Sequence, residues 1–184
     1  GGALPQHWML AFFRAHAALE AQQNVQAINL YEELLGAFPS SPYLLCQLAH
    51  AKYNLREFDE AQLGFEQLLK RDPYRLDQVD TYSNILYVKE SKRSLSALAH
   101  ACVNIDKYRP ETCCVIGNYY SLKAEHEKAV LYFRRALKLN RHFLSAWTLM
   151  GHEYVELKNT AAAVDAYRHA VDINPKDYRA WYGL

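Results

Sequence analysis

A period of 34 residues runs through this chain and constrains its fold more than any other feature. One series at this spacing falls mostly on proline and consists of Pro39, Pro73, Lys107, Arg141 and Pro175. A second series holds only small residues, namely Ala15, Ala49, Ser83, Gly117 and Gly151. A third series, mostly alanine, and a fourth, mostly aromatic, are Ala27, Ala61, Leu95, Ala129 and Ala163, and Tyr31, Phe65, Ala99, Phe133 and Tyr167. Four series in the same phase indicate an internal repeat.

The phase of these series divides the chain into tandem repeats. After leader residues 1–7, the repeats cover 8–41, 42–75, 76–109, 110–143 and 144–177, and residues 178–184 open a sixth. The chain begins with Gly1 and Gly2 instead of Met and stops at Leu184 within that sixth repeat. We therefore expect an excised fragment of a longer protein.

The apolar spacing inside each repeat predicts two helices. In the fifth repeat the spacing i, i+3, i+4, i+7 joins Trp147, Met150, Gly151 and Tyr154 on one face of a first helix. Asn159 is a suitable N-cap for a second helix, whose inner face carries the residues Ala163, Tyr167 and Ala170. Small residues at 151 and 163 let the paired helices cross closely, and the aromatic residues fill the space around the crossing.

This pattern is that of the tetratricopeptide repeat, so we expect an all-α right-handed superhelix, an α-solenoid of stacked helix pairs. First helices would line a concave groove. The residues expected to pack the repeats together are Gly117, Gly151, Ala129, Ala163, Trp147, Tyr154, Phe133 and Tyr167. The third repeat departs from the pattern at Leu95, Ala99 and Cys102, and we expect irregular helix packing there.

Composition and motifs exclude several functional classes. The net charge of +1 lacks the basic excess of nucleic-acid binders, and no apolar run is long enough to span a membrane. No nucleophile elbow, phosphate-binding glycine loop or metal motif occurs, so we expect a non-enzyme that needs no cofactor or metal. The four cysteines lack ligand spacing and fit a packing role in a reducing, intracellular compartment; they are Cys46, Cys102, Cys113 and Cys114.

Repeat arrays of this kind hold extended peptides or neighbouring subunits in their groove, and Asn118 is the most informative groove residue. Its side-chain amide both donates and accepts, so it can bind a peptide backbone of any sequence. Nearby acidic groups could then receive an arginine. The full set of predicted groove residues is Asn118, Glu153, Glu156, Asn84, Glu111, His152 and Tyr182. The carboxylate clamp of chaperone-tail binders is not expected, because Cys114, Leu149 and Gly183 occupy three of its positions.

Longer segments carry a more specific resemblance. They read KYRPETCCVIGNYYSL at 107–122, AWTLMGHEYVELKNT at 146–160, AYRHAVDINP at 166–175 and DYRAWYGL at 177–184, with DPYRLDQVDTYSNILYVKE upstream at 72–90. Together they resemble the subunit eight family of the anaphase-promoting complex, also called the cell division cycle protein twenty-three family. The likeness covers about residues 7–184 and is strongest after residue 72.

That resemblance implies a non-catalytic scaffold of a ubiquitin ligase that controls the cell cycle in the nucleus and cytoplasm. It implies partners as well: other repeat subunits of the complex, a second copy in a full-length homodimer, and the basic C-box motif of the co-activator. Carried over to this chain, the C-box contacts would be Asn118, Glu153 and Glu156. No nucleic-acid or membrane partner is implied.

Two alternatives remain open on the sequence. One is a generic tetratricopeptide-repeat adaptor that binds peptides outside this complex. The other is the regulatory repeat segment of a larger enzyme, with the catalytic domain elsewhere in the chain. Activity of the full-length chain alone would separate the second alternative from a scaffold.

Overall fold

The computed structural model of this protein describes residues 4–183, and these residues form helices and no strands. The chain divides into two compact units, Gly1–Tyr82 and Ser83–Leu184, which we call the N-terminal and C-terminal units. Gly1–Ala3 of the expected leader and Leu184 lie outside the described residues. The rest of that leader, from Leu4 on, is the start of the first helix.

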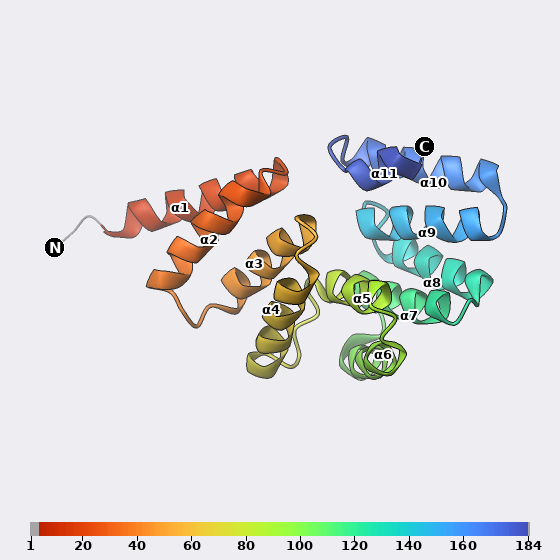
Figure 1. Ribbon diagram of the computed structural model, residues 1–184, viewed down its shortest axis with the longest axis horizontal. Coiled ribbons are helices and arrows are strands. Elements are labelled where there is room, and N and C mark those ends of the chain that lie inside the picture. The colour runs from red at the N-terminus through yellow and green to blue at the C-terminus, as the bar shows by residue number, and fades with distance from the viewer. Residues whose placement is uncertain (1–3, 184) are drawn as a thin grey trace. The chain divides into compact units, whose positions relative to one another are not determined.

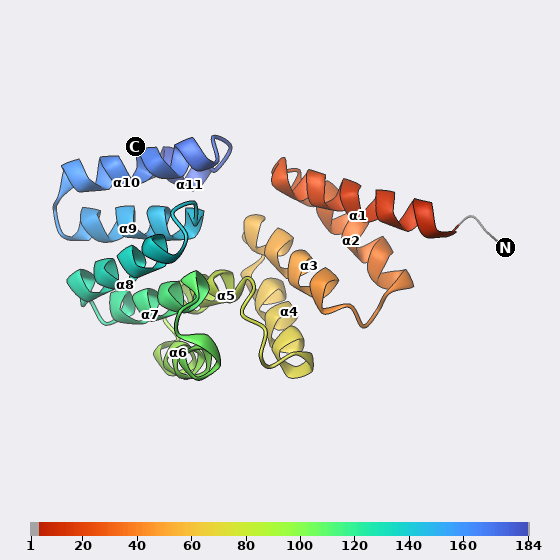
Figure 2. The ribbon, with the colours of Figure 1, turned by 180° about the vertical axis from the view of Figure 1, so that it is seen from behind.

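The N-terminal unit consists of two helical hairpins and the start of a fifth helix. Figures 1 and 2 show these helices from opposite sides. Its helices are α1 (Leu4–Glu20), α2 (Asn24–Ala37), α3 (Pro42–Asn54), α4 (Phe58–Arg71) and the first turn of α5 (Val79–Val88). Ser41 caps α3 by accepting a hydrogen bond from the Leu44 amide at 3.4 Å, and Pro42 supplies a preset first turn. The core between the hairpins is built on the fully buried residues Ala15, Ala27, Tyr31 and Leu44.

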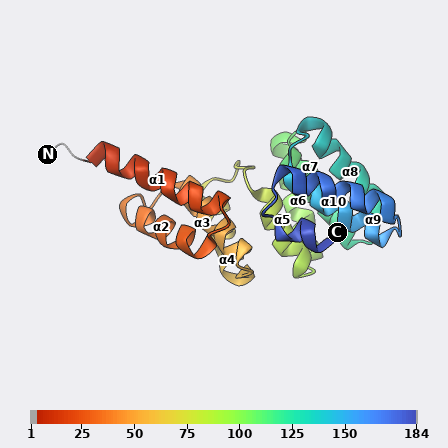
Figure 3. The same cartoon turned by 90° about the horizontal axis from the view of Figure 1, so that it is seen from above.

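The C-terminal unit begins within α5 and contains two further helical hairpins, one in the fourth repeat and one in the fifth (Figures 1 and 3). Its further helices are α6 (Lys92–Asp106), α7 (Pro110–Leu122), α8 (His126–Leu139), α9 (Leu144–Glu156), α10 (Thr160–Ile173) and α11 (Tyr178–Gly183). Asn159 accepts a hydrogen bond from the Ala162 amide at 3.2 Å, which makes it the N-cap of α10. The helix pairs α7–α8 and α9–α10 lie within the repeats 110–143 and 144–177.

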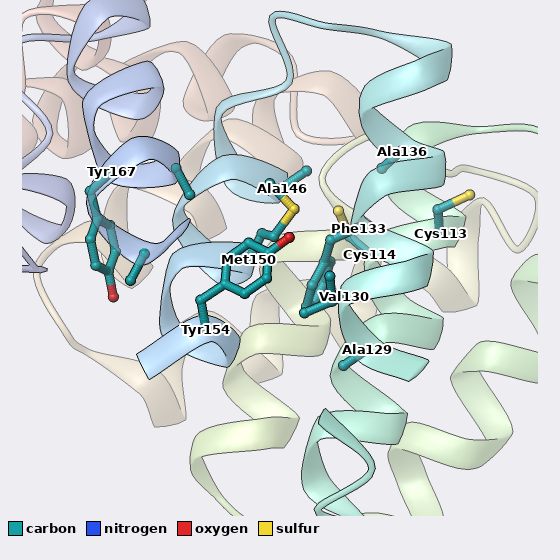
Figure 4. Packing of buried hydrophobic residues seen from close by; sticks show 12 residues of the cluster. Cys113, Cys114, Ala129, Val130, Phe133, Ala136, Ala146, Met150, Tyr154 and Tyr167 are labelled. Atoms are coloured by element: carbon teal, nitrogen blue, oxygen red, sulfur yellow. The ribbon is translucent and has the colours of Figure 1, made fainter. Parts of the chain in front are cut away.

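The two helices of a repeat cross closely at glycines in the fourth and fifth repeats, as the series of small residues predicts. A Cβ atom added at Gly151 would lie 2.5 Å from Cε1 of Tyr167, and one added at Gly117 would overlap the ring of Phe133. Phe133 and Tyr167 are almost fully buried, and Tyr154 and Met150 lie between them (Figure 4). The crossing therefore has room for a backbone and an aromatic ring but for no additional carbon.

The tryptophans of the last repeats tie each first helix to the turn before it. The indole N–H of Trp147 donates to the carbonyl of Arg141 at 2.8 Å. Trp181, which stands 34 residues later, donates in the same way to the carbonyl of Pro175 at 2.7 Å. Each hydrogen bond gives a partner to a backbone carbonyl in the turn that precedes a first helix.

The turn inside every repeat carries a left-handed residue that is not glycine. These residues recur every 34 positions and are Gln22, Arg56, Glu90, Ala124 and Lys158, with φ between 54° and 63°. In the fourth repeat, the amide of the next residue, Glu125, donates back to the carbonyl of Tyr120 and so caps the first helix. The remaining residue with positive φ, Gln78, is out of phase and precedes α5. The third repeat thus begins its first helix at Val79, three residues after the repeat boundary.

The four cysteines are buried, and none of them forms a disulfide within residues 4–183. Burial raises the pKa of Cys46 to about 11 and that of Cys102 to about 12, and it also raises the pKa of Cys113. A thiol with such a pKa stays protonated at neutral pH and reacts slowly.

Candidate functional site

Asn118 is at the centre of a buried polar cluster rather than at an open surface. The residue belongs to α7 and is 2% exposed. The side-chain Nδ2 donates to Ser83 Oγ and to Asn84 Oδ1, both at 2.8 Å, on α5. The expectation that Asn118 faces a groove is therefore corrected: its amide joins two successive first helices. Asn84, also a predicted groove residue, is 8% exposed and belongs to the same cluster.

Glu153 is also buried, and neighbours occupy its carboxylate. Ser121 donates to one carboxylate oxygen, while Nδ1 of His126 lies 2.7 Å from the other. The Ser121 hydroxyl also lies 3.4 Å from the hydroxyl of Tyr87. The expectation of an open Glu153 that receives an arginine is corrected in the same way, since the residue is 5% exposed.

The order of these groups decides what chemistry they support. Hydrolytic triads place the histidine between the hydroxyl and the carboxylate, so that the imidazole can take the proton of the nucleophile. Here the carboxylate of Glu153 is in the middle and separates Ser121 from His126. The arrangement holds helices together and does not activate the serine.

The remaining predicted groove residues are more accessible, but two of them have close partners. Glu111 pairs with Arg109 at 3.1 Å. His152 is hydrogen-bonded to the hydroxyl of Tyr167 at 2.6 Å. Desolvation, followed by the positive charge of Arg179, lowers the pKa of His152. Glu156 is exposed, and Tyr182 is 94% exposed.

Five residues at the C-terminal ends of three first helices form an accessible surface, which we call the first-helix rim. Val88, Leu122 and Glu156 occupy one repeat position, 34 residues apart, and Tyr87 and Val155 occupy the position before it. Val88 is 56% exposed and Val155 is 48% exposed. The contact between Tyr87 and Ser121 shows that equivalent positions of α5 and α7 lie side by side. The rim is thus apolar with a single acidic group at its end.

The structure brings together residues that sequence reasoning did not combine. Ser83 was expected only as a small packing residue, Ser121 was expected to point into the groove, and His126 was given no role. Each of them contacts a predicted groove residue. The pairs 84/118 and 87/121 are each 34 residues apart, and this register was the available signal for the contacts of Asn84 with Asn118 and of Tyr87 with Ser121. The Ser83–Asn118 and Ser121–Glu153 contacts, 35 and 32 residues apart, do not follow it. The position of His126 on α8 follows no such register.

Two further classes of site are not found in residues 4–183. No group of three histidine, cysteine, aspartate or glutamate residues in this range is placed to hold a metal ion. None of the helices in the same range combines the length and the apolar character that a membrane crossing requires.

Comparison with protein families identifies the repeat type. Two tetratricopeptide-repeat profiles match the chain, one at residues 18–79 and the other at 110–143 and again at 144–177. Together they cover more than half of the sequence.

Curated relatives match over most of this chain. Anaphase-promoting complex subunit 8 of Arabidopsis thaliana is 61% identical over 159 residues, which is 86% of this chain and 28% of the relative. The subunit 8 of Dictyostelium discoideum is 58% identical over 88% of this chain and 27% of its own length. Anaphase-promoting complex subunit CDC23 of Saccharomyces cerevisiae is 47% identical over 85% of this chain and 25% of its own length. The chain spans about a quarter of these relatives, and the predicted resemblance is confirmed over that part.

Solved structures agree on the fold. A thermophilic tetratricopeptide-repeat protein of Thermus thermophilus has a TM-score of 0.77 with 19% sequence identity and covers 95% of both chains. MamA of Desulfovibrio magneticus has a TM-score of 0.61 with 16% identity over 95% of this chain and 99% of its own. At these identities the likeness concerns the fold alone, and it confirms the predicted all-α solenoid class.

Proposed function

This chain belongs to the tetratricopeptide-repeat family, and we propose that it is a non-catalytic scaffold segment of subunit 8 of the anaphase-promoting complex, a ubiquitin ligase of the cell cycle. The observation that carries this proposal is the 61% identity to the Arabidopsis subunit over 159 residues. Sequence identity of this size over most of the chain favours a role shared with that subunit over the role of a generic peptide-binding adaptor. The full-length protein would act in the nucleus and cytoplasm, pair with a second copy and contact other repeat subunits.

The buried polar clusters suit a scaffold role. Asn118 joins α7 to α5, and Glu153 joins α9 to α7 and α8. A buried polar group that is fully hydrogen-bonded favours one packing arrangement over its alternatives, because any slip leaves donors and acceptors without partners. Such clusters would keep the first helices in register while partners bind along them.

The co-activator's basic C-box motif is proposed to bind at the first-helix rim. Glu156 is the exposed acidic residue of the rim, and it can receive an arginine through a charge-assisted hydrogen bond. Val88 and Val155 supply apolar contact area beside it. Asn118 and Glu153 would not contact the peptide. They would be positioning residues, because their hydrogen bonds hold together the helices that carry the rim residues.

A fluorescence-anisotropy titration with a labelled C-box peptide tests this function. We expect saturable binding to the chain, weaker binding of a scrambled peptide of the same charge, and at least a roughly tenfold loss of affinity in Glu156→Arg. Glu127→Arg is the matched control, since it makes the same charge change at an exposed residue near the start of α8. Equal binding of the scrambled peptide, or no saturable binding at all, would contradict the proposal.

A further inference from the structure

A second accessible site lies away from the first-helix rim, among α6, α7 and α8. It is a pocket of about 490 Å³ with an apolar lining that includes Val103, Ile116, Tyr132 and Leu139. Val103 is 39% exposed and Leu139 is 47% exposed, so the apolar walls are open to solvent. A pocket of this size is large enough to take a bulky side chain of a binding partner.

Three cations surround this apolar pocket. They are Lys107, Arg135 and Lys138, and no acidic side chain of the described residues lines the pocket. The guanidinium of Arg135 lies 4.7 Å from the ring centre of Tyr132, and Nζ of Lys107 lies 5.1 Å from that of Tyr108. These contacts hold two of the cations at the pocket without neutralising their charge.

A neighbouring pocket on the other side of α8 makes a useful comparison. It also contains Lys138, together with Arg134 and Arg141, but an acidic residue, Asp165, lines it as well. Arg134 there donates to the hydroxyl of Tyr154 at 2.7 Å. The lining of that second pocket thus includes a negative charge beside its cations, whereas the lining of the first pocket includes cations and no acidic residue.

We propose that the pocket among α6, α7 and α8 binds an acidic peptide segment of a partner protein, with one apolar or aromatic side chain of that segment inserted between Val103, Ile116 and Leu139. The apolar lining accounts for the inserted side chain, and the three cations account for carboxylates on either side of it. This site takes a ligand of opposite charge to the C-box, so one chain would hold two different peptides on separate surfaces.

The charge pattern favours a peptide over a nucleic acid. Phosphate backbones are bound by extended basic tracts on proteins with a marked basic excess, and this chain has a formal net charge of only +1. An apolar pocket whose lining includes three cations and no acidic residue matches an apolar side chain flanked by carboxylates. A titration with a labelled single-stranded oligonucleotide tests directly whether the pocket binds nucleic acid instead.

The test is a titration of the chain with a labelled peptide of alternating aspartate and glutamate around one central phenylalanine. We expect saturable binding that falls at least about tenfold in the double variant Arg135→Glu, Lys138→Glu. Arg93→Glu together with Arg168→Glu is the matched control, since both residues are exposed and neither lines the pocket. Replacing the peptide's phenylalanine by alanine should weaken binding by a similar factor.

Three results would overturn the proposal. One is equal loss of binding in the pocket and control double variants, which would reduce the interaction to general charge attraction. Another is unchanged affinity after removal of the phenylalanine or in Val103→Asp, a variant that places a carboxylate in the wall. The third is tighter binding of the oligonucleotide than of the peptide. Circular dichroism of each variant checks that the helices are intact, and the C-box titration is independent of all these outcomes.

Discussion

Gly151 of α9 lies against the ring of Tyr167 of α10, so closely that a Cβ atom at Gly151 would be 2.5 Å from Cε1 of the tyrosine. The Gly117–Phe133 contact repeats this relationship one repeat earlier. The ring of Tyr167 is buried on all sides and cannot move away without disturbing the surrounding core. The absence of a side chain at Gly151 is therefore part of the helix crossing.

Gly151→Ala should accordingly destabilise the C-terminal unit by about 1–3 kcal/mol through overpacking, despite the better helix propensity of alanine. Gly36→Ala is the matched control, because a Cβ there meets nothing within 4 Å. Urea denaturation followed by circular dichroism should place the control within about 1 kcal/mol of the parent chain. Equal stabilities of the two variants would contradict the close crossing.

Ala124→Gly should stabilise the fold. Ala124 has φ 60°, a left-handed conformation that costs a residue with a Cβ roughly 1–2 kcal/mol, whereas glycine adopts it freely. After subtraction of the greater flexibility of glycine in the unfolded chain, a gain of about 0.5–1 kcal/mol is expected. Ala101→Gly, at an exposed position inside α6, should instead cost about 1 kcal/mol in the same denaturation experiment.

The buried thiols predict both a labelling pattern and a pH dependence. The four cysteines should resist a thiol reagent such as dithionitrobenzoate at pH 8 in the folded chain and react completely in urea. The folded pKa values of Cys46 and Cys102, about 11 and about 12, exceed the ordinary thiol pKa of 9.0. The preference of the fold for protonated thiols therefore contributes fully to the free energy of unfolding below about pH 9. That contribution is lost, and the free energy of unfolding should fall, as the pH rises from there toward about 12. Cys102→Ala should reduce this alkaline loss, and rapid labelling of the folded chain would contradict the burial.

Ser121 and Glu153 should be energetically coupled. Their hydrogen bond lies in the same buried cluster as the His126 contact, so each single substitution disturbs groups that the other one needs. A double-mutant cycle with Ser121→Ala and Glu153→Gln should give a coupling energy between about 0.5 and 3 kcal/mol in the unfolding free energy. Ser121→Ala with Glu156→Gln is the control cycle, and strict additivity in the first cycle would argue against the bond.

The helices were largely predictable because the repeat spacing depends directly on how the helices pack. The same residue types recur wherever two helices must cross, so helices such as α7 and α9 begin at the boundaries of their repeats, at Pro110 and Leu144. The start of α5 was not predictable from the period. There Gln78 takes a left-handed conformation and its side chain accepts a hydrogen bond from Thr81 at 2.9 Å, and the helix begins only at Val79.

The candidate site was predicted less well, for a physical reason. A polar residue on a first helix can face solvent or the next first helix, and the sequence of one repeat does not distinguish the two directions. The spacing of Asn84 and Asn118 by one full repeat, read together with their complementary amides, was the clue to a contact between them. The His126–Glu153 contact joins positions 27 residues apart and leaves no periodic trace.

Asn118 joins two successive first helices and, in the proposed function, keeps them in the positions that form the first-helix rim. Asn118→Ala removes both of its donated hydrogen bonds, so the unfolding free energy should fall by about 1–3 kcal/mol, while exposed Asn104→Ala should leave it nearly unchanged. In a C-box titration under conditions where the variant is still folded, the dissociation constant should change by less than about fivefold, or about 1 kcal/mol. Unchanged stability together with abolished peptide binding would contradict the claim and make Asn118 a direct peptide contact.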